Sequence, residues 1–112
     1  MRPLPLFLLE IVFRLPFLSR PAFLADVVSE CPAREELRSD MVLVEIRDGY
    51  LKWAHLQCPK CGDHIQLPLA GRNRWSVDVD LFRRPTLTPS IWEGGSCGAH
   101  FFVRNGKLDW CR

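Results

Sequence analysis

Apolar and polar residues alternate along most of the chain from residue 41 onward, and this period-two pattern predicts β-strands. Residues 41–47 are rich in valine and isoleucine, and residues 50–57 continue the pattern after Asp48-Gly49. Aspartate followed by glycine is typical of a two-residue hairpin turn, because both residues tolerate a positive φ angle. Residues 64–69 place isoleucine and leucine at every second position. We therefore expect a hairpin followed by a third strand.

The C-terminal part of the chain predicts a second group of strands. Residues 75–80 alternate cleanly, and residues 100–104 and 107–111 flank Asn105-Gly106, a strong signal for a short hairpin. Residues 86–92 are expected to be irregular, because Pro89 cannot donate a hydrogen bond within a central strand. The expected fold class is mostly β, a small α+β domain built from antiparallel hairpins.

The first 21 residues form an apolar arm that differs from the rest of the chain. Residues 5–15 predict a short helix, opened by Pro5 and ended by Pro16, with an apolar surface nearly all round. We expect this arm to pack on its own domain; the alternative is docking on a partner protein or a membrane surface. No transmembrane segment is predicted, since a span needs about 20 apolar residues. Residues 22–112 form the expected β domain, beginning with a strand at 22–28.

The composition is that of a small globular domain. The chain has 112 residues, of which 47% are hydrophobic and 25% charged. A net charge of +2 is too small to indicate nucleic-acid binding by itself. The five cysteines are an odd number, which fits a metal in a reducing compartment better than a disulfide framework. No signal-peptide cleavage site ends the apolar arm, so we expect a cytoplasmic protein.

Two short turns in the chain, Cys58–Cys61 and Cys97–His100, have the spacing of a metal site, and we call them the first and second hooks. Two residues separate Cys58 from Cys61, and two residues separate Cys97 from His100. Two such pairs can supply the four ligands of a tetrahedral zinc ion. We predict one Zn²⁺, bound by these four side chains, that cross-links two hairpins. Because four protein ligands leave no position for water, the predicted ion is structural.

Cys111 is the alternate fourth ligand. A two-residue turn at Asn105-Gly106 places Cys111 opposite His100, within about 5 Å across the strands. Cys111 is then either the fourth ligand or a thiol beside the site, and we favour His100 because Cys-x-x-His repeats the spacing of Cys-x-x-Cys. Three other donors are expected to lie outside the site, namely His55 and His64 as hydrogen-bonded side chains and Cys31 as a small buried residue.

If the chain acts as an adaptor, the loops at residues 70–74 and 82–95 are expected to form its contact surface. It contains four arginines and one exposed aromatic residue: Arg72, Arg74, Arg83, Arg84 and Trp92. Asp78 and Asp80 balance the arginines, so the favoured interpretation is a solvated loop, and the alternative is contact with phosphate or with an acidic protein.

Three stretches carry a family resemblance. They are Cys58-Pro59-Lys60-Cys61-Gly62, residues 85–92 (PTLTPSIW) and the run from Cys97 to Trp110. Together they resemble a family of small bacterial and phage proteins of unassigned function, found beside genes for ubiquitin-like activating and conjugating enzymes. The resemblance covers about residues 40–111. It implies a compact zinc-binding β domain, with a component of a ubiquitin-like conjugation system as its protein partner.

The expected function is that of a non-enzymatic zinc-binding adaptor, accessory to a bacterial ubiquitin-like conjugation or defence system. We expect no catalytic residues, because the chain lacks a Gly-x-Ser-x-Gly elbow, a phosphate-binding loop and a dinucleotide fingerprint. Two alternatives stay open. The first is a metal-dependent, deubiquitinase-like hydrolase with zinc in a catalytic site, and the second is a zinc-ribbon-like module that binds nucleic acid.

Overall fold

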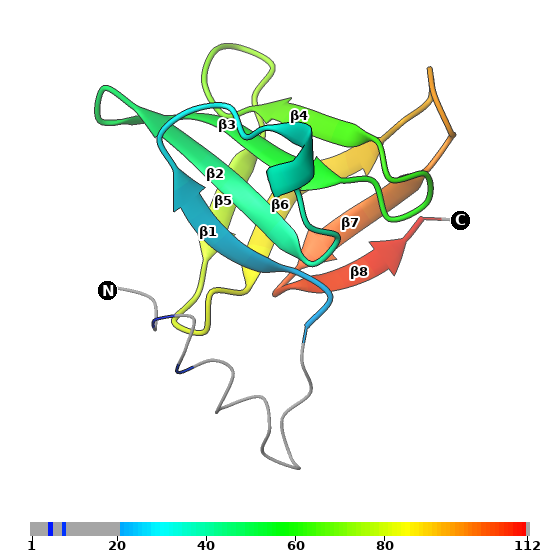
Figure 1. Cartoon of the computed structure of the whole chain (residues 1–112). Helices are drawn as coiled ribbons and strands as arrows, with labels where there is room; N and C mark the ends of the chain where they lie inside the picture. The colour runs from blue at the N-terminus through cyan, green and yellow to red at the C-terminus, as the bar shows by residue number, and fades with distance from the viewer. Residues whose placement is uncertain (1–4, 6–7, 9–20, 112) are drawn as a thin grey trace.

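Eight strands form two four-stranded sheets in this computed structural model, which describes residues 5, 8 and 21–111 (Figure 1). The first sheet contains, in spatial order, β1 (Leu24–Val28), β2 (Met41–Arg47), β3 (Tyr50–Gln57) and β4 (His64–Pro68). The second contains β5 (Ser76–Val79), β6 (Pro85–Trp92), β7 (His100–Arg104) and β8 (Lys107–Trp110). A single turn of 3₁₀ helix, η1 (Arg34–Glu36), lies between β1 and β2. The prediction of a mostly β fold is confirmed.

The predicted hairpins are present with the expected pairing. Apart from β1 and β2, which run parallel, neighbouring strands within each sheet are antiparallel. Asp48 and Gly49 connect β2 to β3 with φ angles of 52° and 81°, and Asn105 and Gly106 connect β7 to β8 with φ angles of 49° and 74°. Four positive φ angles at these turns explain why short polar residues and glycine occupy them.

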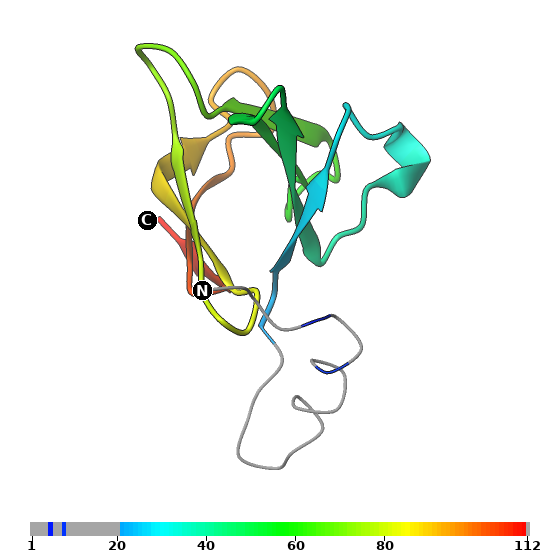
Figure 2. The same cartoon turned by 90° about the vertical axis from the view of Figure 1, so that its left-hand side faces the viewer.

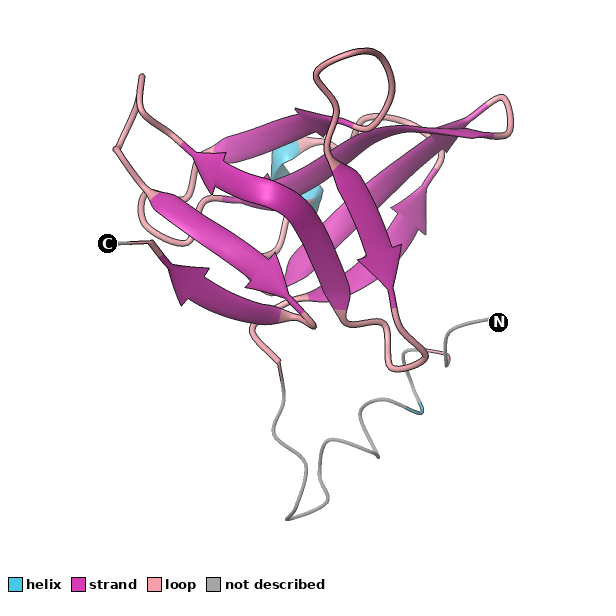
Figure 3. Ribbon diagram, turned by 180° about the vertical axis from the view of Figure 1, so that it is seen from behind, coloured by secondary structure: helices cyan, strands magenta, loops and turns pink. Residues whose placement is uncertain are grey.

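The two sheets face each other and share one hydrophobic core (Figure 2). The first sheet contributes alternate residues such as Val44 and Leu56, and the second contributes Ile91, Phe101 and Val103. Side chains alternate between the two faces of a strand, so the neighbours of these core residues point to the outer face of each sheet. On the second sheet, shown from behind in Figure 3, that outer face carries candidate functional residues.

The strand β6 corrects the expectation of an irregular segment at residues 86–92. It is an eight-residue strand in the interior of the second sheet, between β5 and β7. Its pairing with β5 ends at Thr88, and its pairing with β7 is interrupted between Leu87 and Ile91. Pro89 therefore lies where neither neighbour needs its missing N–H group, which is how a proline fits into this strand.

The N-terminal arm, including its predicted helix, lies outside the described residues except at positions 5 and 8. The strand expected at 22–28 is present as β1. Within the described part of the chain, no helix is long and apolar enough to cross a membrane.

Candidate functional site

Three of the four predicted metal ligands come together. The sulfur atoms of Cys58, Cys61 and Cys97 all lie within 4.8 Å of one another, and the sulfurs of Cys58 and Cys97 are 3.6 Å apart. Tetrahedral zinc with Zn–S bonds of about 2.3 Å requires sulfur–sulfur distances of about 3.8 Å. The three thiols therefore fit a zinc-like ion.

Backbone hydrogen bonds shape both hooks. In the first, the Gly62 N–H donates to the Cys58 carbonyl at 2.9 Å, and Gly62 has a φ of 79° that favours glycine. In the second, the Gly98 N–H donates to the Glu93 carbonyl at 2.8 Å. The Lys60 ammonium group joins the hooks, since it donates to the Cys97 carbonyl at 3.0 Å.

The thiols do not ionise equally. Burial acts to raise the pKa of Cys58, but backbone hydrogen bonds from Cys61 and Lys60 outweigh it and leave that pKa below its usual value. A backbone hydrogen bond from Asp63 acts to lower the pKa of Cys61, but desolvation and the neighbouring thiols raise it to about 11. One negative charge in the cluster thus opposes a second, and a bound cation would remove that opposition.

His100, the fourth predicted ligand, is not part of this thiol cluster. Its Nε2 atom instead forms a hydrogen bond of 2.9 Å with the Ser90 Oγ atom. The alternate ligand, Cys111, lies opposite His100 as the hairpin register predicted, and its N–H donates to the His100 carbonyl at 2.8 Å. The hook that begins at Cys97 therefore presents His100 to a serine.

Ser90 and His100 lie on adjacent strands, at a partly exposed position on the outer face of the second sheet. The Trp75 indole N–H donates to the Ser90 carbonyl at 3.4 Å, which ties down the backbone where sheet pairing is interrupted. A serine hydroxyl that donates to a histidine Nε2 is the arrangement in which imidazole removes the proton of a serine nucleophile. The pair is therefore a candidate nucleophile and general base.

A second histidine cluster lies on the outer face of the first sheet. The His55 Nε2 atom is 2.8 Å from a Glu45 oxygen, and His55 Nδ1 is 2.7 Å from His64 Nε2. Glu45 and His55 are 1% and 0% exposed, and the Arg47 guanidinium is 2.7 Å from the second Glu45 oxygen. The expectation that His55 and His64 are hydrogen-bonded side chains is confirmed for both.

Cys31 corrects one prediction. It is exposed rather than buried, and its sulfur lies within 4.8 Å of ligand atoms of Glu45 and His55. Both nitrogens of His55 are already hydrogen-bonded, and Arg47 already balances the charge of Glu45. These buried groups are therefore satisfied by their protein partners.

The predicted contact surface is only partly available for binding. Arg83 forms an ion pair with Asp26 at 3.1 Å, and Arg84 forms one with Asp80. Arg72 and Arg74 are exposed on the loop before β5. Trp92 is 70% exposed, and its ring centre lies 6.3 Å from that of His100. The aromatic member of the surface is thus next to the Ser90–His100 pair.

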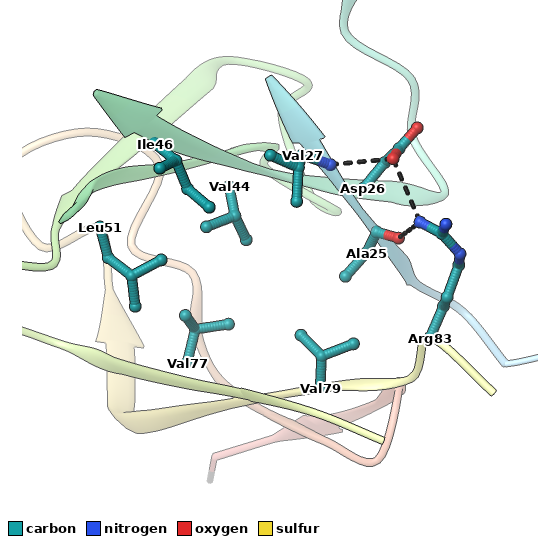
Figure 4. A pocket seen from close by; sticks show the side chains of 9 residues that line it. All are labelled: Ala25, Asp26, Val27, Val44, Ile46, Leu51, Val77, Val79 and Arg83. Atoms are coloured by element: carbon teal, nitrogen blue, oxygen red, sulfur yellow. Dashed lines mark hydrogen bonds and ion pairs between the residues drawn. The ribbon is translucent and has the colours of Figure 1, made fainter. Parts of the chain in front are cut away.

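An apolar pocket of about 260 Å³ lies between the two sheets, near β1 and β5 (Figure 4). The Asp26–Arg83 ion pair lies at its edge, and seven aliphatic residues line it: Ala25, Val27, Val44, Ile46, Leu51, Val77 and Val79. None of its lining residues is a nucleophile or a histidine, so this pocket and the serine–histidine pair are separate features.

The sequence model of a known family, described as "Bacterial ubiquitination-like system serine protease (BubE)", matches residues 27–111, about three quarters of the chain. This chain belongs to the BubE family. No curated protein and no solved structure matches it. The predicted association with a bacterial ubiquitin-like system is therefore correct, and the BubE match implies protein partners from that system.

The BubE match also corrects two predictions. A family described as a serine protease contradicts both the non-enzymatic adaptor and the expectation that the chain is not an enzyme. The match favours the hydrolase alternative instead. The prediction relied on the absence of a Gly-x-Ser-x-Gly elbow. That elbow is only one way of presenting a nucleophilic serine, and a nucleophile and its base are recognised by their geometry.

Ser90 is the residue that sequence reasoning missed. It lies inside the PTLTPSIW stretch, but Pro89 suggested an irregular segment, and His100 was assigned to the metal because of its spacing from Cys97. The signal in the sequence was that Ser90 and His100 lie in two of the stretches that carry the family resemblance, residues 85–92 and 97–110. Only the pairing of β6 with β7 shows that the two side chains meet.

Proposed function

We propose that this BubE-family chain is a serine protease of a bacterial ubiquitination-like system, with Ser90 as the nucleophile and His100 as the general base. The observation that carries the proposal is the 2.9 Å hydrogen bond between Ser90 Oγ and His100 Nε2. The family description supports the reaction class and the cellular system.

In the first half of the reaction, Ser90 Oγ attacks the carbonyl carbon of the substrate. The Oγ–H bond breaks, and its proton moves to His100 Nε2 as the Oγ–C bond forms. The tetrahedral intermediate collapses when the bond to the leaving group breaks, and His100 gives its proton to that group. The product is an ester between Ser90 and the acyl part of the substrate.

In the second half, water takes the place of the leaving group. His100 Nε2 accepts a proton from the water as its oxygen attacks the ester carbonyl. Collapse of the second intermediate releases the acid, and the proton returns from His100 to Ser90 Oγ. The enzyme is then ready for another cycle.

The tautomer of His100 follows from this role. Nε2 must accept the Ser90 proton, so the neutral ring carries its proton on Nδ1. Within the described residues, His100 has no carboxylate hydrogen-bonded to Nδ1, and its backbone is held by the Cys111 N–H. We therefore propose a serine–histidine dyad whose orientation comes from the sheet.

We propose a structural part for the metal. Zinc would be held by Cys58, Cys61 and Cys97, with Cys111 as the candidate fourth donor, and its positive charge would let the clustered thiols ionise. The second hook ends at His100, so a metal that fixes Cys97 also fixes the start of β7. The ion would support the base without taking part in the reaction.

The proposed substrate is a ubiquitin-like modifier of the same system, joined through its C-terminal carbonyl to another group. The test is hydrolysis of a fusion in which such a modifier precedes a fluorescent protein, followed by electrophoresis and mass spectrometry. The zinc-loaded full chain should release the modifier by cleavage at one bond. Ser90→Ala should reduce the rate at least about a thousandfold.

A matched control is Ser76→Ala. Ser76 is an exposed serine on the neighbouring strand β5, paired with Thr88, and has no histidine partner among the described residues. The Ser76→Ala variant should cleave the fusion at the wild-type rate. Equal rates for the wild type and Ser90→Ala would overturn the assignment of the nucleophile.

A further inference from the structure

Trp92 is the most exposed large hydrophobic residue among those described, with 70% of its surface accessible. It is directly opposite His100 in the pairing of β6 with β7, and the two rings are tilted by 44° with centres 6.3 Å apart. Trp92 is also two positions after Ser90, on the same outer face of the strand. The indole therefore flanks the proposed dyad on the histidine side.

Gly94 helps to hold this exposed indole in place. A Cβ atom at position 94 would lie 2.6 Å from Cζ2 and 2.7 Å from Cε2 of Trp92, closer than non-bonded carbon atoms approach. The indole thus lies directly against the backbone of Gly94, in space that any other residue would occupy. The Gly94 backbone lies against the indole and the His100 ring lies near it, and 70% of the Trp92 surface stays accessible to solvent.

The chemistry of the dyad determines which part of a substrate lies next to Trp92. His100 Nε2 receives the Ser90 proton and then delivers it to the leaving group, so the leaving group must lie on the His100 side of the scissile bond. Trp92 lies on that same side. A held, solvent-facing indole binds apolar groups well, because it offers a large contact area with little loss of side-chain freedom.

We propose that Trp92 is a substrate-positioning residue that contacts an apolar side chain on the leaving-group side of the scissile bond. This inference rests on the proposed function of Ser90 and His100, and it adds a specificity that the family description does not contain. It predicts that the enzyme distinguishes leaving groups by the apolar side chain of their first residue.

Transfer of an acyl group to added amines tests this without knowledge of the natural substrate. p-Nitrophenyl acetate first acetylates Ser90, and phenylalanine amide or glycine amide then competes with water for the acetyl-enzyme. The ester bond to Ser90 breaks as the new amide bond forms, and the amine proton returns through His100 to Ser90 Oγ. Because the amine attacks from the leaving-group side, its preference reports contacts on that side.

The wild type should transfer to phenylalanine amide about tenfold better than to glycine amide, after subtraction of the uncatalysed reaction. Trp92→Ala should bring this ratio close to one while the rate of Ser90 acetylation stays within about threefold. Trp92→Phe should keep most of the preference. Gly94→Ala should weaken it although Trp92 is still present, since the added Cβ displaces the indole.

Trp110→Ala is the control, because Trp110 is also half-exposed but packs on Phe101 instead of His100. It should leave the ratio unchanged. A wild-type ratio near one, or an unchanged ratio in Trp92→Ala, would overturn the role of Trp92 while Ser90 acetylation upholds the dyad. Absence of any acetyl-enzyme on Ser90 would overturn both proposals.

Discussion

Each sheet of this protein carries a histidine-centred cluster on its outer face. The central histidine is accessible only in the cluster of the second sheet, which we call the open cluster. His55 is fully buried between Glu45 and His64, whereas His100 is partly exposed beside Ser90. The segment between β1 and β2 accounts for the difference. Its Leu37 packs with residues of the first sheet in a small second core, and the Leu37 carbonyl accepts a hydrogen bond from Gln57.

The comparison shows that the partners of a histidine determine what it can do. Glu45 accepts a hydrogen bond from His55 Nε2–H, so His55 Nδ1 must accept one from His64. Both nitrogens of His55 are then occupied by protein groups, which suits a structural role. His100 Nε2 instead faces a hydroxyl that can react, and Ser90 and His100 both keep part of their surface accessible to solvent.

The largest expected effect concerns the open cluster. His100→Ala should lower the rate of modifier–fluorescent protein cleavage about ten-thousandfold, because Ser90 loses its base. The free energy of unfolding should change by less than about 1 kcal/mol, since His100 is only partly buried. Urea titration of the same sample checks the second statement. Wild-type activity in His100→Ala would show that His100 is not the general base.

The next effect concerns the metal that we place beside the open cluster. Cys61→Ser should lose stoichiometric zinc and about 4 kcal/mol of stability, because the ion stabilises the folded chain outright. Elemental analysis after gel filtration measures the zinc, and urea unfolding measures the stability. Cys31→Ser is the matched control, an exposed cysteine outside the thiol cluster. Full zinc content in Cys61→Ser would refute the proposed ligand set.

The cluster around His55 should show the opposite behaviour. His55→Leu leaves the buried Glu45 carboxylate without its imidazole and should reduce the free energy of unfolding by about 3 kcal/mol. The double variant with Glu45→Leu should recover part of this loss, because it removes the buried carboxylate that has lost one of its partners. Acetylation of Ser90 should continue in the folded fraction of both variants. A full loss of acetylation in folded His55→Leu would show that the two clusters are coupled.

The smallest effect is the pH dependence of the cluster around His55. Burial, followed by the electrostatic influence of the neighbouring His55, lowers the pKa of His64 below its ordinary value of 6.5. Below pH 6.5 the unfolded chain therefore binds a proton that the folded chain does not. Stability should be complete above pH 6.5, decrease as the pH falls below it, and level off below the folded-state pKa.

The variant His64→Asn isolates this contribution. Urea titrations between pH 4 and 8 should give a steeper loss of stability for the wild type than for the variant. Parallel curves for the two proteins would contradict the lowered pKa.

Much of the fold and half of the site follow from local sequence. Asp48-Gly49 and Asn105-Gly106 define two turns, and the second turn sets the register that places Cys111 opposite His100. The spacing of Cys58 and Cys61 predicts part of the thiol cluster, because two ligands separated by two residues lie in one bend. Such features depend on residues near in sequence, which is why patterns reveal them.

The Ser90–His100 pair could not be predicted in the same way. The two residues lie on different strands, and the β6–β7 pairing is interrupted next to Ser90. No local pattern specifies how that interruption aligns the strands. The same limit applies to His55, whose burial depends on a covering segment that precedes it in the sequence.

Mass-spectrometric mapping of a fluorophosphonate adduct tests the central claim most directly. The reagent reacts with a serine hydroxyl that a neighbouring base activates, and it requires no knowledge of the substrate. The account predicts a single adduct on Ser90 in the zinc-loaded full chain and no adduct in His100→Ala. A folded protein that is unlabelled, or that carries the adduct on another serine, would contradict it.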